Sequence, residues 1–138
     1  MTPDTTAQLD ERQCLRLLAG ASVGRLVYSV GALPAVLPFR YRLSADGCVQ
    51  LSTGADSALV RAVSGALVAF EAGEVAESDG GGWSVTVLGR AEVDAAPAAA
   101  APGTGRMSIR IRPELLRGRV LPAAPTEPSA REGRPLLP

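Results

Sequence analysis

The stretch PAVLPFRYRLSADGCVQLST, residues 34–53, decides how the rest of this chain is interpreted. It holds two runs in which apolar and polar residues alternate, joined by Ala45-Asp46-Gly47. Alternation with a period of two is typical of a β-strand with one buried face and one outward face. The apolar positions are Leu37, Phe39, Tyr41 and Leu43 in the first run and Val49 and Leu51 in the second.

The length of the turn fixes the register expected for this hairpin. A two-residue turn would mix the faces, because opposed residues of an antiparallel pair point to the same side. A three-residue loop, closed by Gly47 in the left-handed conformation, pairs position 44 with position 48 and keeps the faces apart. Leu43 then faces Val49 and Tyr41 faces Leu51. The outward face is predicted to carry Arg40, Arg42, Gln50 and Ser52.

Composition limits the possible classes of function. The chain has 138 residues, enough for one domain with one core. A formal net charge of zero argues against a nucleic-acid binder or an acidic-membrane binder. All 14 basic residues are arginine, and His and Lys are absent. A His-ligated metal, a Ser-His nucleophile and a Schiff-base lysine are therefore excluded.

Several features favour a cytoplasmic location. Cys14 and Cys48 fit neither a CxxC nor a zinc pattern and are expected to be free structural thiols. The N-terminus, MTPDTTAQLDERQ, is too polar for a signal peptide. The longest uncharged run, residues 26–39, is too short to span a membrane.

The remaining elements are expected at short spacing. Residues 1–8 are predicted to be a flexible arm, in which Asp4, Thr5 or Thr6 caps a helix over 9–19. A second helix is expected over 55–64. With the hairpin, six strands are predicted, over 23–30, 34–44, 48–53, 66–75, 83–93 and 107–112, and residues 114–121 close the fold. Six strands at this spacing indicate a small antiparallel barrel, because closure removes exposed edges. The domain is expected over 9–121 with a flexible loop at 95–105, followed by a disordered tail at 122–138.

Five segments, in this order, resemble the flavin-nucleotide-binding split-barrel family, the pyridoxamine 5'-phosphate oxidase-like proteins, in its small actinobacterial branch. They are VGRLVYSV (23–30), PAVLPFRYRL (34–43), VAFEAGEV (68–75), GWSVTVLGRAEV (82–93) and IRIRPELLRGRVL (109–121). The resemblance implies a mainly β fold, a six-stranded antiparallel split β-barrel of Greek-key type with two short helices. It also implies a homodimer with small-molecule sites at the subunit interface, without nucleic-acid or membrane partners.

The same resemblance implies a flavin along the outward face of the hairpin. The expected cofactor is FMN, with the deazaflavin F420 or no cofactor as alternatives. No catalytic side chain and no metal ligand is assigned. The implied cofactor-binding residues are Pro38, Phe39, Arg40, Tyr41, Ser52, Thr53, Ser57, Arg61 and Trp83.

Three positions depart from the family pattern. Arg40 replaces the usual Asn, Ser52 replaces the usual Arg, and Ala58 stands where a Lys is usual. A flavin phosphate is a dianion that needs arginine, lysine or a helix N-terminus. Arg40, Arg42 or Arg61 supplies the missing charge, or standard phosphate binding is lost. Trp83 is either a wall beside the flavin ring or a packing residue.

Two functions remain open at this point. The first is a flavin- or deazaflavin-dependent oxidoreductase of unknown substrate, in which the cofactor carries the hydride chemistry. The alternative is a non-catalytic binding or regulatory module that has lost standard FMN binding. A haem-binding barrel is a weaker third option, since without His the iron ligand would be Cys, Met or Tyr.

Overall fold

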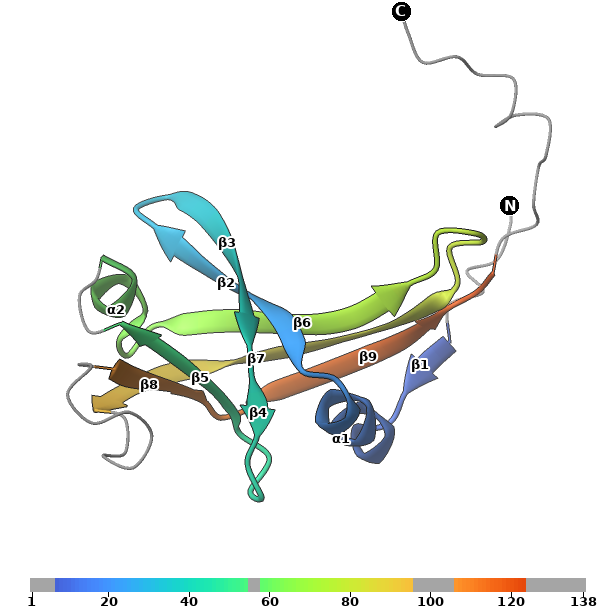
Figure 1. Cartoon of the computed structure of the whole chain (residues 1–138), viewed down its shortest axis with the longest axis horizontal. Coiled ribbons are helices and arrows are strands. Elements are labelled where there is room, and N and C mark those ends of the chain that lie inside the picture. The colour runs from blue at the N-terminus through green and yellow to red at the C-terminus, as the bar shows by residue number, and fades with distance from the viewer. Residues whose placement is uncertain (1–6, 55–57, 96–105, 124–138) are drawn as a thin grey trace, which may run out of the picture.

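The structure is a computed structural model that describes residues 7–54, 58–95 and 106–123 (Figure 1). Within these residues the chain forms nine strands and two short helices. They are β1 (Ala7–Leu9), α1 (Glu11–Gly20), β2 (Val23–Val30), β3 (Leu33–Arg40), β4 (Arg42–Leu43), β5 (Val49–Gly54), α2 (Ala58–Val63), β6 (Leu67–Val75), β7 (Gly82–Ala95), β8 (Arg106–Ile111) and β9 (Leu115–Leu121).

All strand pairs are antiparallel, and the main strand order is β3-β2-β6-β7-β8-β5-β4. Strand β9 pairs with β7 and with β1. The two ends of the order, β3 and β4, are consecutive in the chain and meet at Tyr41, so the sheet curls back on itself (Figure 1). This arrangement confirms the predicted mainly β antiparallel split barrel with two short helices.

The long strand β7 divides the barrel into two sheets. Its first part, residues 82–90, pairs with β6 and β9, and its last part, residues 91–95, pairs with β8. We call β1, β2, β3, β6, β9 and the first part of β7 the larger sheet. The smaller sheet consists of β4, β5, β8 and the last part of β7.

The prediction of six strands was too low. The segment predicted only to close the fold is strand β9, and β1 begins inside the segment predicted to be a flexible arm. The first strand of the hairpin is divided into β3 and β4. Predicted features at residues 1–6, 55–57, 96–105 and 124–138 lie outside the described residues.

One core lies between the inner faces of the two sheets and α1. It is built mostly from Val, Leu and Ile, and each large buried side chain contributes about 1.5–3 kcal/mol. Strand β9 comes so close to α1 that a Cβ at Gly118 would lie 2.5 Å from the Cys14 Sγ atom. The fully buried large side chains are Phe70, Leu18, Leu26, Ile109, Ile111, Val49, Val63, Val85, Val87, Cys14 and Cys48.

Helix α1 begins two residues later than predicted, and its N-cap is Asp10 rather than Asp4, Thr5 or Thr6. The Asp10 carboxylate accepts from the Gln13 N–H at 2.8 Å, and the Gln13 side chain accepts from the Asp10 N–H at 2.9 Å. This reciprocal capping box satisfies two backbone donors at the helix start. Cys14 and Leu18 form the buried side of the helix, as the apolar stripe predicted.

The hairpin turn has the predicted register. Arg42 faces Gln50 and Leu43 faces Val49. The Ser44 N–H donates to the Cys48 carbonyl at 2.9 Å, and Gly47 has a φ of +87°. The three-residue loop with a left-handed glycine is therefore confirmed.

On the N-terminal side of Arg42 the predicted register was wrong. Arg40 pairs with Val23 of β2, so it does not continue the outward face with Ser52, and the expected pair of Tyr41 with Leu51 does not form. Tyr41 causes the change: its N–H donates to the Ser22 carbonyl at 3.0 Å and its hydroxyl to the Leu18 carbonyl at 2.6 Å. Its ring packs edge-on against Phe70 at 4.9 Å and 66°. These contacts turn the chain from β5 towards β2.

Candidate functional site

The outward face of the smaller sheet carries most of its polar side chains. Gln50 of β5 faces Arg110 of β8, and Ser52 faces Ser108. Because opposed residues share a face, each of these pairs points away from the core, on which Leu51 and Ile109 lie. We define the arginine–serine face by Arg42, Gln50, Ser52, Arg106, Ser108 and Arg110.

Arg106 and Ser52 are joined across this face. The Arg106 Nε and Nη2 atoms donate to the Ser52 Oγ at 3.2 and 3.0 Å. Both residues are exposed. Since the Ser52 oxygen accepts from the guanidinium, its own proton is available to an external acceptor. The pair thus presents a cation and a hydroxyl donor to solvent, which suits an anionic ligand.

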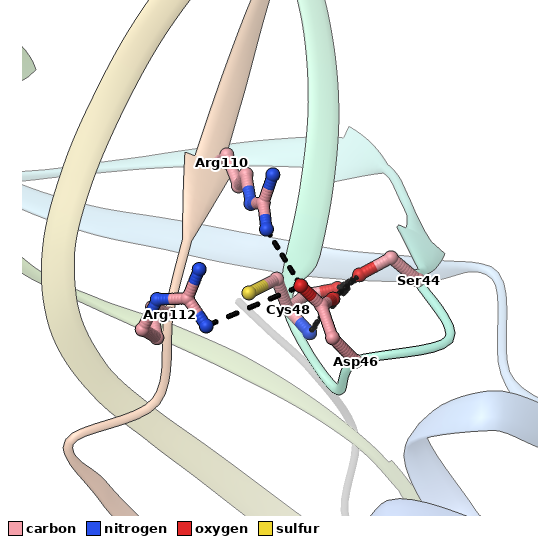
Figure 2. Close-up of polar contacts among 5 residues, drawn as sticks. All are labelled: Ser44, Asp46, Cys48, Arg110 and Arg112. Carbon is pink, nitrogen blue, oxygen red and sulfur yellow. Dashed lines mark hydrogen bonds and ion pairs between the residues drawn. The ribbon is translucent and has the colours of Figure 1, made fainter.

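A second arginine of the face is held by a carboxylate in the hairpin turn (Figure 2). The Arg110 Nη2 lies 2.6 Å from the Asp46 Oδ2, and the Arg112 Nη1 lies 4.0 Å from the same oxygen. The hydrogen bond from the Ser44 hydroxyl lowers the pKa of Asp46 to about 2, and the charge of Arg110 acts in the same direction. Asp46 is therefore ionised at neutral pH, and it partly neutralises Arg110.

The predicted site residues around Tyr41 are largely structural. Tyr41 is only 5% exposed, and burial raises its pKa to about 12. Its hydroxyl is engaged by the Leu18 carbonyl. Phe39 is partly buried against the core, whereas Pro38 and Arg40 are exposed on β3. The Tyr41 side chain therefore helps to anchor the fold.

The other predicted residues are not all brought together. Thr53 follows Ser52 on β5 and is half-buried opposite Met107. Arg61 is exposed on the short helix α2, and Ser57 lies outside the described residues. Of the predicted residues that the structure describes, only Ser52 belongs to the arginine–serine face.

Trp83 lies at the other end of the barrel within one chain. It faces Glu74 of β6 and Val120 of β9 at the start of β7. Ser52 pairs with Ser108 across β5 and β8, and Ser108 in turn pairs with Asp94 of β7. Eleven positions along β7 separate Trp83 from Asp94, a span of up to roughly 36 Å. Trp83 packs against the core and forms no common site with Ser52 in one subunit.

The sequence prediction missed Arg106. The alternation over 107–112 placed Ser108 and Arg110 outward, and Arg106 continues the same parity by one more residue. The pairing of β8 with β5 is a long-range contact that the local pattern does not contain. Among the described residues, no group of three or more His, Cys, Asp or Glu side chains could hold a metal ion. In the same ranges no helix is long and apolar enough to cross a membrane.

We compared the chain with models of protein families and with known proteins. A family model described as pyridoxamine 5'-phosphate oxidase matches residues 10–132. Rv0080 of Mycobacterium tuberculosis is 37% identical over an alignment of 95 residues, which covers 61% of this chain and 58% of that protein. The chain thus spans little more than half of that relative.

Solved structures share the fold. The FAD binding protein from Mycobacterium smegmatis superposes with a TM-score of 0.70 at 26% identity, covering 84% of this chain and 98% of that one. An FAD-binding protein from Mesorhizobium loti gives a TM-score of 0.68 at 21% identity, covering 85% of this chain and 99% of that one. At the lower identity the likeness concerns the fold alone.

Proposed function

This chain belongs to the pyridoxamine 5'-phosphate oxidase family, and we propose that it binds FMN on its arginine–serine face as a flavin-dependent oxidoreductase. The similarity to an FAD binding protein of Mycobacterium smegmatis supports a flavin as the class of ligand. The choice of FMN rests on the chemistry of the face itself.

The observation that carries the proposal is the position of Arg106. Ser52 replaces the arginine that the family resemblance leads one to expect on this strand. The guanidinium of Arg106 reaches across from β8 and lies on the Ser52 hydroxyl, at 3.0 Å from Nη2. A cation is thus restored beside position 52 by a different strand. A phosphate dianion would receive charge-assisted hydrogen bonds from Arg106 and a further donor from Ser52.

The residues of the face are suited to holding and orienting a nucleotide rather than to proton transfer. A bound flavin supplies the hydride chemistry itself. Arg106 and Ser52 would hold the phosphate, and Arg42 and Gln50, opposite each other on β4 and β5, would hydrogen-bond the remaining polar groups. The class of substrate would be determined by the residues that lie over the flavin ring.

We also propose that the protein is a cytoplasmic homodimer with its flavin sites at the subunit interface. Cys14 and Cys48 are both free and buried, which suits a reducing compartment. On the outward face of the larger sheet, apolar residues face one another across five strands. We define this apolar row by Val36, Val27, Ala69, Leu88 and Leu115.

The apolar row is a suitable surface for the second subunit. Val36 is 55% exposed and Leu115 is 42% exposed in the single chain. A contiguous apolar patch of this kind is uncommon on the surface of a monomer. Burying it against a second copy would remove it from water.

The test is a fluorescence titration with two flavins. FMN and riboflavin share the ring system, and only FMN carries the phosphate. We expect FMN to bind at least tenfold more tightly than riboflavin. Arg106→Ala should reduce FMN affinity to that of riboflavin, and Arg12→Ala, an exposed arginine on α1, is the matched control. Failure of both flavins to bind at tens of micromolar would overturn the proposal.

A carrier or regulatory module is the second candidate, and the engagement of Tyr41 favours it. The Tyr41 hydroxyl is committed to the Leu18 carbonyl, and the chain has no His or Lys. The arginine–serine face therefore holds no group that transfers protons near neutral pH. Flavin affinity before and after dithionite reduction separates the two candidates. An oxidoreductase should keep both the oxidised and the reduced flavin bound, whereas a carrier should release one of these two forms.

A further inference from the structure

A pocket lies apart from the arginine–serine face, where three segments of the chain meet. Its walls come from the first turns of α1, from the hairpin turn at Asp46-Gly47, and from the link between β8 and β9. Its volume is about 420 Å³. This is the size of cavities that bind small organic molecules, about 300–1,000 Å³. We call it the α1 pocket and define it by Glu11, Leu15, Asp46, Arg112, Glu114 and Leu116.

The lining combines an apolar part with an excess of negative charge. Leu15 and Leu116 are half-buried and give the pocket an apolar surface. Of its three carboxylates, that of Asp46 is paired with Arg110 and Arg112, and those of Glu11 and Glu114 leave an excess of negative charge. The excess of negative charge favours a cationic ligand.

Two of the carboxylates remain available to a ligand. Asp46 is engaged by Arg110 at 2.6 Å. Within residues 7–54, 58–95 and 106–123, neither Glu11 nor Glu114 forms an ion pair. In the same ranges no group of three or more His, Cys, Asp or Glu side chains could hold a metal ion. The two carboxylates without an ion pair suit the ammonium group of an organic cation.

The walls are held in place by backbone contacts. The capping box of Asp10 and Gln13 fixes the start of α1, next to Glu11. The Glu114 N–H donates to the Leu88 carbonyl at 2.8 Å, which ties the β8–β9 link to β7. A preformed site loses less conformational entropy when a ligand binds.

The geometry points to the α1 pocket as a binding site for a primary amine with an apolar body. The ammonium group lies between Glu11 and Glu114, and the apolar part packs on Leu15 and Leu116. This site is distinct from the proposed flavin site. Asp46 links the two, since it lines the pocket and holds Arg110 of the arginine–serine face.

The test is an NMR titration of the full chain with phenethylamine, followed by ¹H–¹⁵N correlation spectra and run without added flavin. We expect saturable shifts at amides 11–15 and 114–116. Glu114→Gln and Glu11→Gln should each raise the Kd at least fivefold, because each removes a charge and keeps the side-chain shape. Glu74→Gln, at an exposed glutamate on β6, is the matched control and should bind as the wild type does.

Two further probes sharpen the outcome. Phenylacetate has a similar shape and the opposite charge, and should cause no saturable shift. Calcium chloride should also leave these amides unchanged. Equal binding of phenylacetate, saturation by calcium, or no saturation by 10 mM phenethylamine would overturn the proposal. None of these outcomes depends on whether the protein binds a flavin.

Discussion

The outward faces of the two sheets differ, although their inward faces form one core. The larger sheet presents the apolar row from Val36 to Leu115, and the smaller sheet presents the arginine–serine face. Strand β7 takes part in both. Its outward residues change from Leu88 in the first part to Glu92 and Asp94 in the last part, while Val87 and Ala91 stay buried.

This difference separates fold from function within one molecule. The inward alternation is the same along both sheets and is sufficient to build the barrel. The outward residues are free to differ, because they contribute little to the core. An apolar outward face suits a protein partner, and a polar face with exposed arginine and serine side chains suits a phosphate-bearing ligand.

The largest effect is expected from Phe70→Ala, which removes a side chain of the shared core. Phe70 is fully buried and packs on Tyr41 at the junction of the sheets. We expect the free energy of unfolding in urea to fall by about 3–5 kcal/mol. Leu67→Ala, at a position 55% exposed, should cost much less. A similar loss in both variants would show that the core does not unite the two sheets.

Leu88→Asp should disrupt the apolar row of the larger sheet and leave the arginine–serine face unchanged. An unpaired carboxylate in a buried interface costs several kcal/mol, so the dissociation constant of the proposed dimer should rise at least about 100-fold. Sedimentation velocity over a range of concentrations measures it. Ser108→Asp places the same charge on the smaller sheet, outside the apolar row, and should weaken the proposed dimer much less. If Ser108→Asp dissociates the dimer and Leu88→Asp does not, the two faces have been assigned the wrong way round.

Tyr41→Phe tests the residue at which the chain passes from one sheet to the other. Loss of the hydrogen bond to the Leu18 carbonyl should lower stability by about 1 kcal/mol at pH 7. Burial raises the pKa of Tyr41 from about 10 to about 12. The neutral phenol therefore stabilises the fold below pH 10, and this contribution is lost as the pH rises towards 12.

Urea unfolding between pH 8 and 12 measures this alkaline loss. The wild type should lose more stability over that range than Tyr41→Phe does. Tyr28→Phe, which removes the other phenol hydroxyl of the chain, on β2, serves as the control. Parallel pH profiles for the wild type and Tyr41→Phe would contradict the assignment of the alkaline loss to Tyr41.

The smallest effect on stability is expected from Asp46→Asn, which concerns only the smaller sheet. The pKa of Asp46 is lowered to about 2, first by the Ser44 hydroxyl. Its contribution to stability is therefore present above about pH 4 and lost as the pH falls towards 2. In urea unfolding between pH 2 and 5, the free energy of unfolding of Asp46→Asn should therefore lack this acid-dependent contribution.

The same variant sharpens the distinction between the faces. With Asp46 neutral, Arg110 loses its ionic partner, so FMN affinity should rise severalfold, because more positive charge faces the ligand. The dimer dissociation constant should not change. An altered dimer with unaltered FMN affinity would contradict the separation of the two outward faces.

The sequence was sufficient to predict the hairpin turn and most strands. Alternation and the glycine at position 47 determined the pairing of Arg42 with Gln50, because only one loop length kept the faces apart. The break at Tyr41 was not predictable from this pattern, since the alternation continues through it. Its causes are contacts with Leu18 and Phe70, which are distant in sequence.

The candidate site was harder to predict for the same reason. The cation beside Ser52 comes from Arg106, 54 positions away, and depends on the pairing of β5 with β8. Trp83 lies at the far end of β7 and joins no common site within one chain. Asp10 carried a readable signal, because a Gln three residues later is typical of a capping box.

The close approach of Gly118 to Cys14 has a consequence for evolution. A Cβ at position 118 would lie 2.5 Å from the Cys14 sulfur, so the two positions share one volume. Gly118→Ala alone should be poorly tolerated, and Cys14→Gly alone should leave a void. Together the two replacements transfer that volume from α1 to β9. Among descendants of this sequence, the two positions are expected to covary, with bulk at one accompanied by its absence at the other.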